Sequence, residues 1–287
     1  MRLGLVTPIV TRVPRAHSPW EAAAGPAELV RVAMAADKLG YEHLTCSEHI
    51  AIPVDMAAAR GGTYWDPLST FGFLAGQTDR IRFLTHVLVL GYHHPLEIAK
   101  RYGTLDRISN GRLTLGLGVG SLREEFDLLD APFDERGARA DDALRALRAA
   151  WGTAIPHYDG EYYRFDALVV DPQPSQQRVP LWIGGRTRRS LRRAVELGDG
   201  WAPFGLARHQ LRELLDSVKL PTGFDVVLPA PPLDPAADPD AVVRTLASLA
   251  DAGATVVNVA LRAGSVEEYV QQLHTLAGLA GPAVGRP

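Results

Sequence analysis

The chain has 287 residues, of which 46% are hydrophobic and 22% are charged, and its formal net charge is −3. This composition is typical of a globular protein with a packed core and excludes a disordered or fibrous chain. Because the net charge is slightly negative, no general basic surface is available to neutralise phosphates, and we expect no nucleic-acid partner.

Short apolar or β-branched runs alternate with helix-length segments along the chain. Eight runs are predicted to be strands, at residues 3–7, 43–47, 81–90, 112–118, 181–184, 200–204, 224–228 and 255–260. Helices are predicted at residues 27–39, 67–78, 95–108, 135–151, 188–197, 209–218, 241–252 and 266–279. Several strands are continuously apolar, which indicates parallel strands that helices cover on the outside.

The repeated βα unit favours one α/β domain over residues 1–287, a (β/α)8 TIM barrel. An open doubly wound sheet is the alternative. Residues 152–180, between strands four and five, carry an aromatic cluster without a helical period and are interpreted as an insertion on the barrel. Long ordered loops of this kind usually serve a functional site.

Expectations about the cellular location of the protein and about bound metal rest on motifs that the sequence lacks. Cys46 is the single cysteine, so no intramolecular disulfide can form, and no run approaches eighteen apolar residues. We therefore expect a cytoplasmic protein without a membrane partner. The histidines and carboxylates show no metal-ligand spacing, and we expect no metal site.

The loops after the strand C-termini are where barrel enzymes place their sites, and the second strand ends in Ser47-Glu48-His49. A histidine there can act as a general acid or base near neutral pH, and an adjacent carboxylate can orient a bound ring. The alternative is a structural histidine whose hydrogen bonds are satisfied within the fold.

Glycine-rich turns follow strands four and five. The first is Gly116-Leu117-Gly118-Val119-Gly120-Ser121, and the second is Gly184-Gly185-Arg186-Thr187 before a predicted helix. Such turns let backbone N–H groups approach an anion, and a helix start favours phosphate. Two of them predict a phosphorylated cofactor, with Arg186 beside the second. Close strand packing is the alternative reason for the glycines.

These residues resemble the bacterial luciferase-like monooxygenase superfamily, within it the branch that uses the deazaflavin coenzyme F420. Ser47-Glu48-His49 is similar to the Ser-Asp-His of that family. Further similar segments follow in the family's order: 94–100, 104–106, 109–120, Glu125-Phe126, Arg136, 160–163, 180–185 and 198–201.

The resemblance implies a TIM barrel that binds the ring of F420 at the strand C-termini. Val119, Gly120, Gly184 and Gly185 would hold the phosphate, with Ser121 and Arg186 in the same cofactor-binding set, and residues 152–180 would roof the site. His49 would stand near the reactive edge of the ring, and Glu48 would help to anchor the ring. Both are expected to be catalytic.

The resemblance also implies a kink in the third strand that presses against the deazaflavin ring. Thr85-His86-Val87 aligns with it, so we expect a non-proline cis peptide between His86 and Val87, both of which would contact the cofactor. A regular trans strand is the alternative.

Two departures from the sugar-phosphate dehydrogenase branch stand out: Ser121 and Pro53 occupy the places of a catalytic glutamate and a tryptophan. Oxidation of a sugar phosphate is therefore not expected. The leading hypothesis is hydride transfer between F420 and a small organic substrate, by a protein expected to be a homodimer. The alternatives are an FMN-dependent monooxygenase that needs a separate flavin reductase, and a non-catalytic cofactor-binding protein.

Overall fold

Eight parallel strands form a closed barrel in the computed structural model, which describes residues 1–14 and 17–281. Strand β13 pairs with β1, with Val257 opposite Leu3, and this pairing closes the ring. The TIM barrel prediction is confirmed, and the open sheet is wrong. In barrel order the strands are β1 (Arg2–Leu5), β3 (His43–Cys46), β5 (Arg82–Thr85), β7 (Leu113–Gly118), β10 (Leu181–Gly184), β11 (Gly200–Ala202), β12 (Asp225–Pro229) and β13 (Val256–Val259).

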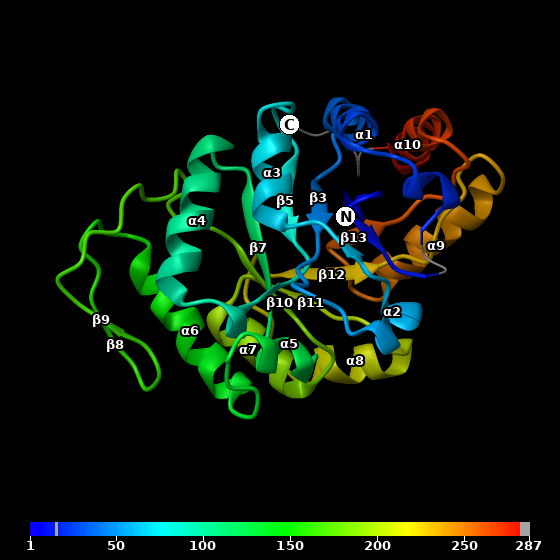
Figure 1. Cartoon of the computed structure of the whole chain (residues 1–287). Coiled ribbons are helices and arrows are strands. Elements are labelled where there is room, and N and C mark those ends of the chain that lie inside the picture. Colours follow the sequence, from blue (N-terminus) through cyan, green and yellow to red (C-terminus); the bar gives the residue numbers. More distant parts are fainter. Residues whose placement is uncertain (15–16, 282–287) are drawn as a thin grey trace.

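Helices surround the strands on the outside (Figure 1). The eight predicted helices are all present, with ends shifted by at most a few residues. They are α1 (Pro26–Leu39), α3 (Pro67–Ala75), α4 (Pro95–Ile108), α6 (Arg136–Ala150), α7 (Arg188–Leu197), α8 (Arg208–Asp216), α9 (Pro239–Asp251) and α10 (Val266–Ala280).

Capping residues account for several of these ends. The Asp66 carboxylate accepts a hydrogen bond from the Ser69 N–H at 2.7 Å at the start of α3. Asp238 does the same for Ala241 in α9, which is why that helix begins at Pro239, two residues before the predicted start. Gly40 ends α1 with a φ of 80°, a left-handed conformation that glycine adopts at low cost.

Short elements that the periodicity did not predict lie mainly in the loops after the strands. They are β2 (Thr11–Arg12), η1 (Pro19–Ala22), α2 (Val54–Arg60), β4 (Thr63–Tyr64), η2 (Leu90–Tyr92), α5 (Arg123–Leu128), β8 (Tyr158–Asp159) and β9 (Arg164–Phe165). Strand β6 (Leu88–Val89) lies within the run predicted as the third strand. Strands β2 and β4 pair antiparallel and join the loops after β1 and β3. These two loops are therefore connected over the C-terminal end of the barrel.

The third strand is not the single run predicted at residues 81–90. Strand β5 ends at Thr85, the peptide between His86 and Val87 is cis, and β6 then pairs with β7, with Leu88 opposite Leu117. The expected non-proline cis peptide is confirmed at the predicted bond, and the regular trans strand is wrong.

The insertion at residues 152–180 lies beside the barrel. Its hydrogen bonds reach the outer helices, from the Tyr158 hydroxyl to Asp142 on α6 and from the Ser175 N–H to Asp106 on α4. Figure 1 shows its β8–β9 hairpin on the far side of α6 from the strands. The Tyr163 ring packs edge-on against His94, the N-cap of α4, with centroids 5.4 Å apart. Helix α4 begins at the C-terminal end of the barrel, its mouth, so part of the segment reaches toward that end. The expected roof over the site stays a prediction.

Side chains from five of the strands pack together in the barrel interior: Leu84, Trp182, Ala202, Val227 and Val256. His43 shares this interior, with its ring centroid 5.6 Å from that of Trp182 and its Nε2 2.7 Å from the Asn258 Oδ1. Cys46 is buried, as expected of a small apolar side chain in a strand.

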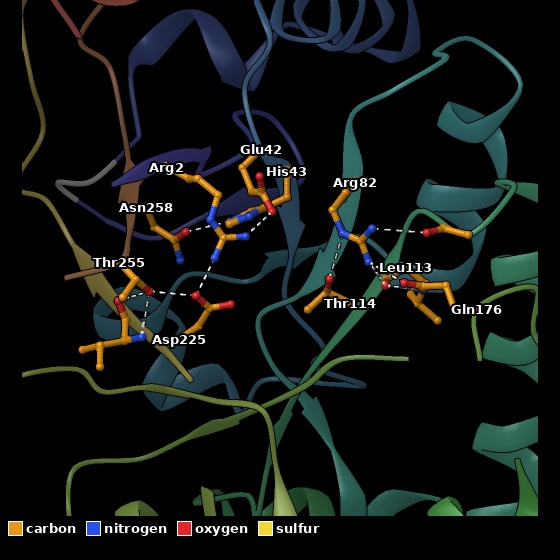
Figure 2. A network of polar contacts seen from close by, with 12 residues as sticks. Arg2, Glu42, His43, Arg82, Leu113, Thr114, Gln176, Asp225, Thr255 and Asn258 are labelled. Carbon is orange, nitrogen blue, oxygen red and sulfur yellow. Dashed lines mark hydrogen bonds and ion pairs between the residues drawn. The ribbon is translucent and has the colours of Figure 1, made fainter. Parts of the chain in front are cut away.

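Polar side chains close the N-terminal end of the barrel (Figure 2). Arg2, in β1, donates to Glu42 at 2.7 Å and to Asp225 at the start of β12. Arg82, in β5, donates to the Leu113 carbonyl at 2.6 Å and to the Gln176 side chain at 3.0 Å. Residues at this end of a TIM barrel usually serve stability, and the functional site is expected at the other end.

Candidate active site

A cavity of about 290 Å³ lies at the C-terminal end of the barrel. Its walls come from Val6 and Thr7 after β1, Ser47 after β3, His86 after β5, and Ala260 after β13. Residues of the loop after β1 and Tyr269 of α10 complete it. The cavity therefore occupies the place where enzymes of this fold bind their ligands.

His49 is paired with a carboxylate beside this cavity. Its Nδ1 lies 2.7 Å from the Oε2 of Glu125, on α5, and the same oxygen accepts a hydrogen bond from the Tyr92 hydroxyl at 2.9 Å. The other oxygen of Glu125 accepts from the Ile50 N–H at 2.6 Å. The Tyr64 ring packs edge-on against His49, with centroids 4.5 Å apart. Glu125 therefore orients the imidazole and leaves its Nε2 available.

The Glu125 carboxyl is ionised at neutral pH. Burial opposes its ionisation, but the hydrogen bonds from His49, Tyr92 and the Ile50 amide outweigh burial, and the pKa is lowered from 4.5. Burial and the adjacent Glu125 raise the pKa of the Tyr92 hydroxyl, which thus stays a donor. An anionic acceptor on Nδ1 selects the tautomer that carries its proton on Nδ1, which leaves Nε2 for general acid or base chemistry.

Glu48 is buried and engaged on both oxygens. Its Oε2 accepts from the Val89 N–H at 2.7 Å, and its Oε1 lies 2.6 Å from the His93 Nε2. Burial lowers the pKa of His93, but the hydrogen bond and charge of Glu48 outweigh burial and raise it above 6.5. The contacts of Glu48 therefore hold the chain after the cis peptide. Its expected role as an anchor for the ring stays a prediction.

The segment around the cis peptide is held from β3. The Ser47 hydroxyl donates to the His86 carbonyl at 2.8 Å, and the Glu48 N–H donates to the Val87 carbonyl at 3.2 Å. Burial lowers the pKa of His86 to about 4, so this imidazole is neutral at pH 7. Its Nδ1 is buried and has no hydrogen-bond partner in the part of the chain that the structure describes.

The glycines after β7 and β10 make room for side chains at the mouth. A Cβ on Gly118 would lie 2.6 Å from the Val87 Cγ2, and a Cβ on Gly184 would lie 3.0 Å from the Val87 Cγ1. Gly120 has a φ of 80°, and a Cβ there would lie 2.5 Å from the Phe126 ring. Close packing, the alternative reason for these glycines, is therefore present.

Helix α7 begins at the end of β10, next to the second glycine pair. Thr187 is its N-cap, and the Thr187 hydroxyl accepts a hydrogen bond from the Ser190 N–H at 3.2 Å. No acidic residue occupies the first turn. Arg186 is exposed, with its guanidinium 5.8 Å from the centroid of the Phe204 ring. This helix start can accept an anion.

The structure thus brings most of the predicted site residues to one end of the barrel. His86 lines the cavity, Val87 packs against the glycine turns, and Val119 and Gly120 continue from β7. Ser121 is exposed beyond them.

Sequence reasoning assigned no role to Glu125, Tyr92 or Tyr64, although Glu125 stood in a motif of the resemblance. Short elements such as α5 carry too few residues for a periodic signal, so this position could be found only by motif.

The residues described here hold no group of three or more His, Cys, Asp or Glu side chains that could bind a metal ion. Nor, in that part of the chain, does any helix combine the length and the apolar character needed to cross a membrane.

The family model for luciferase-like monooxygenases matches residues 1–275. A curated, uncharacterized protein of Mycobacterium tuberculosis is 29% identical over 256 residues, which cover 83% of this chain and 89% of that protein. The chain is also similar to an F420-dependent glucose-6-phosphate dehydrogenase of Nakamurella multipartita, at 31% identity over 62% of this chain and 52% of the relative.

A flavin-dependent relative matches to a similar degree. The oxygenase component of the trigonelline monooxygenase of Acinetobacter baylyi is 28% identical over 60% of this chain and 46% of its own length. Among solved structures, a monooxygenase from Streptomyces bottropensis superposes with a TM-score of 0.80 at 23% identity, covering 97% of this chain and 98% of that one. At this identity the superposition supports the fold.

Proposed function

The chain belongs to the luciferase-like monooxygenase family, and on that basis we propose that it is a coenzyme F420-dependent oxidoreductase acting on a small organic substrate. The family contains both F420-dependent and flavin-dependent enzymes. The observation that carries the proposal is the pairing of His49 with the buried Glu125 beside the mouth cavity. When bound, the deazaflavin would supply or accept the hydride.

The mouth has the features that such a cofactor requires. Gly118 and Gly184, the last residues of β7 and β10, both lie next to the Val87 side chain. The buried Nδ1 of His86 has no hydrogen-bond partner among the described residues and could bond to a ring heteroatom. Next to Gly185, the start of α7 offers N–H groups for a phosphate, with Arg186 beside it.

The remaining residues of the site have separate roles in the proposal. His49 would donate or accept a proton at Nε2, while Glu125 holds the imidazole through Nδ1. Tyr92 donates to Glu125 and fixes that carboxylate. Glu48 would keep the backbone after Val87 in place through the Val89 N–H and His93. Glu48 and Glu125 are thus positioning residues, and His49 is the catalytic one.

The proposal is tested by titrating the purified protein with F420, with FMN and with the deazaflavin riboside that lacks the phosphate and its tail, and by following fluorescence quenching. We expect micromolar binding of F420 and at least about tenfold weaker binding of FMN. Arg186→Met should weaken binding of F420 by about 10- to 150-fold, since a hydrogen bond to a charged group contributes about 1.5–3 kcal/mol. Binding of the riboside should not change.

A second candidate is an FMN-dependent monooxygenase, which the similarity to the flavin-dependent trigonelline enzyme supports. In that case FMN would bind more tightly than F420, and turnover would require a separate flavin reductase. A protein that binds neither cofactor would refute both candidates.

A further inference from the structure

The wall of the mouth cavity opposite His86 contains none of the residues proposed to hold or protonate the cofactor. It is formed by the loop after β1, with Thr7, Thr11 and Glu21, and by Tyr269 near the start of α10. The cavity volume of about 290 Å³ is at the lower end of the range for ligand pockets, about 300–1,000 Å³. Only a small molecule fits there.

This wall carries hydroxyl groups that lack hydrogen-bond partners. The Oγ1 atoms of Thr7 and Thr11 and the hydroxyl of Tyr269 are buried and have no hydrogen-bond partner among residues 1–14 and 17–281. Thr7 and Tyr269 each have a relative exposure of 2%. Because a buried hydroxyl without a partner is unfavourable, these groups are expected to be satisfied by a molecule in the cavity. Hydroxyl groups can both donate and accept, so they match an uncharged alcohol or carbonyl.

The charge of the wall disfavours an anion. Glu21 lines the cavity, and its carboxylate accepts hydrogen bonds from the Ile9 N–H at 2.9 Å and the Ser18 N–H at 2.7 Å. No Lys or Arg among residues 1–14 and 17–281 lines the cavity. The described wall also holds two imidazoles: His86, which burial keeps neutral at pH 7, and His17, whose Nδ1 lies 2.8 Å from the Val13 carbonyl oxygen. A phosphate or carboxylate would therefore meet the Glu21 carboxylate without a Lys or Arg of the described wall to offset it. The amides already bonded to Glu21 also reduce its attraction for a cation.

We propose that this wall is the substrate subsite and that it selects a small uncharged molecule bearing a hydroxyl or carbonyl oxygen. The inference rests on the proposed function, because His86 at the opposite wall belongs to the proposed cofactor site. It goes further by excluding phosphorylated and carboxylated substrates. Thr7, Thr11 and Tyr269 would bind the oxygen, and Glu21 would reject anions.

The test uses three probes of similar shape: cyclohexanol, cyclohexanecarboxylate and cyclohexylamine. Their binding to the full-length protein is measured by saturation-transfer NMR and calorimetry. We expect cyclohexanol to bind, cyclohexanecarboxylate to bind at least tenfold more weakly, and cyclohexylamine to show no tenfold advantage over the alcohol. Absence of cyclohexanol binding, or tighter binding of either charged probe by tenfold, would overturn the proposal.

Substitutions in the cavity wall test whether cyclohexanol binds there. Thr7→Val and Tyr269→Phe should each weaken cyclohexanol binding by about 3- to 10-fold, as expected for one hydrogen bond. The control is Thr275→Val, also on α10, because the Thr275 hydroxyl already donates to the Gln271 carbonyl at 3.0 Å. Glu21→Gln should reduce the discrimination against the carboxylate. If that variant does not fold, the two hydroxyl variants still decide the matter.

The affinity for F420, measured on the same variants, separates this inference from the proposed function. We expect it to be unchanged by Thr7→Val and Tyr269→Phe. If these variants weaken F420 binding and leave cyclohexanol binding unchanged, the wall belongs to the cofactor and the substrate subsite is refuted. If the wild-type protein binds cyclohexanol but no cofactor, the proposed function fails while the selectivity of the cavity for uncharged molecules stands.

Discussion

The Nδ1 of His49 lies 2.7 Å from the Oε2 of Glu125, although 76 positions separate the two residues in the chain. His49 follows β3, and Glu125 lies on α5 after β7, so the barrel brings two separate loops together. The contact gives the histidine a fixed orientation and a buried anionic partner. Four sets of variants test this arrangement and the structure around it.

His49→Ala is expected to lower turnover by about 10²–10⁴-fold, the usual contribution of a positioned acid or base. Turnover is measured with reduced F420 and 2-cyclohexenone, a small uncharged acceptor. The affinity for F420 should change little, because the proposed contacts to the phosphate lie at α7. The control is His209→Ala, an exposed histidine on α8. Equal turnover in the two variants would show that His49 is structural.

Glu125→Gln is expected to change the tautomer of His49 without unfolding the protein. In the wild type the Nδ1–H of His49 donates a hydrogen bond to the Glu125 carboxylate, so ¹⁵N NMR of the side chain should report a protonated Nδ1. The neutral amide of the variant selects this tautomer less strongly, and turnover should fall. Tyr92→Phe should produce a smaller change in the same direction. An unaltered His49 spectrum in Glu125→Gln would contradict the positioning role.

His93→Gln should lower the free energy of unfolding by about 3–5 kcal/mol at pH 6, because it leaves the Glu48 carboxylate without its charged partner. The pKa of His93 is raised above 6.5 in the folded protein. This contribution is therefore fully present below pH 6.5 and is lost as the pH rises through the folded pKa.

Denaturant unfolding at pH 6 and pH 9 measures the effect of His93→Gln. The difference between wild type and variant should be larger at pH 6. His157→Gln is the control, since the pair of His157 with Asp166 is exposed and should contribute less than about 1 kcal/mol. If His93→Gln lowers the free energy of unfolding equally at pH 6 and pH 9, His93 and Glu48 do not form a charged pair.

Gly120→Ala should destabilise the protein by about 1–3 kcal/mol, the usual cost of overpacking. Its Cβ would lie 2.5 Å from the Phe126 ring and 2.9 Å from the Val89 Cγ1, at a backbone φ of 80°. Gly72→Ala on α3 is the matched control, because no atom lies within 4 Å of its added Cβ. There we expect a gain of about 0.5–1 kcal/mol from higher helix propensity. Thermal and urea unfolding of both variants measure the contrast.

The repeat of apolar runs and helical segments was enough to predict the barrel, its eight strands and its eight main helices. Such patterns are local, since they follow from side chains that must face a core at a period of about 2 or 3.6 residues. The motif Ser47-Glu48-His49 and the glycine turns likewise indicated the end of the barrel that carries the site. The cis bond at His86–Val87 was predicted by resemblance and is present.

Other features were decided only by the tertiary structure. The placement of residues 152–180 beside the barrel depends on contacts with α4 and α6. The pairing of His49 with Glu125, the engagement of Glu48 by His93, and the unpartnered hydroxyls of Thr7 and Tyr269 join residues from different loops. A periodic pattern in the sequence predicts which face of a helix or strand is buried. It does not predict which side chain from a distant part of the chain packs against that face. Burial and charge at this site arise from that pairing.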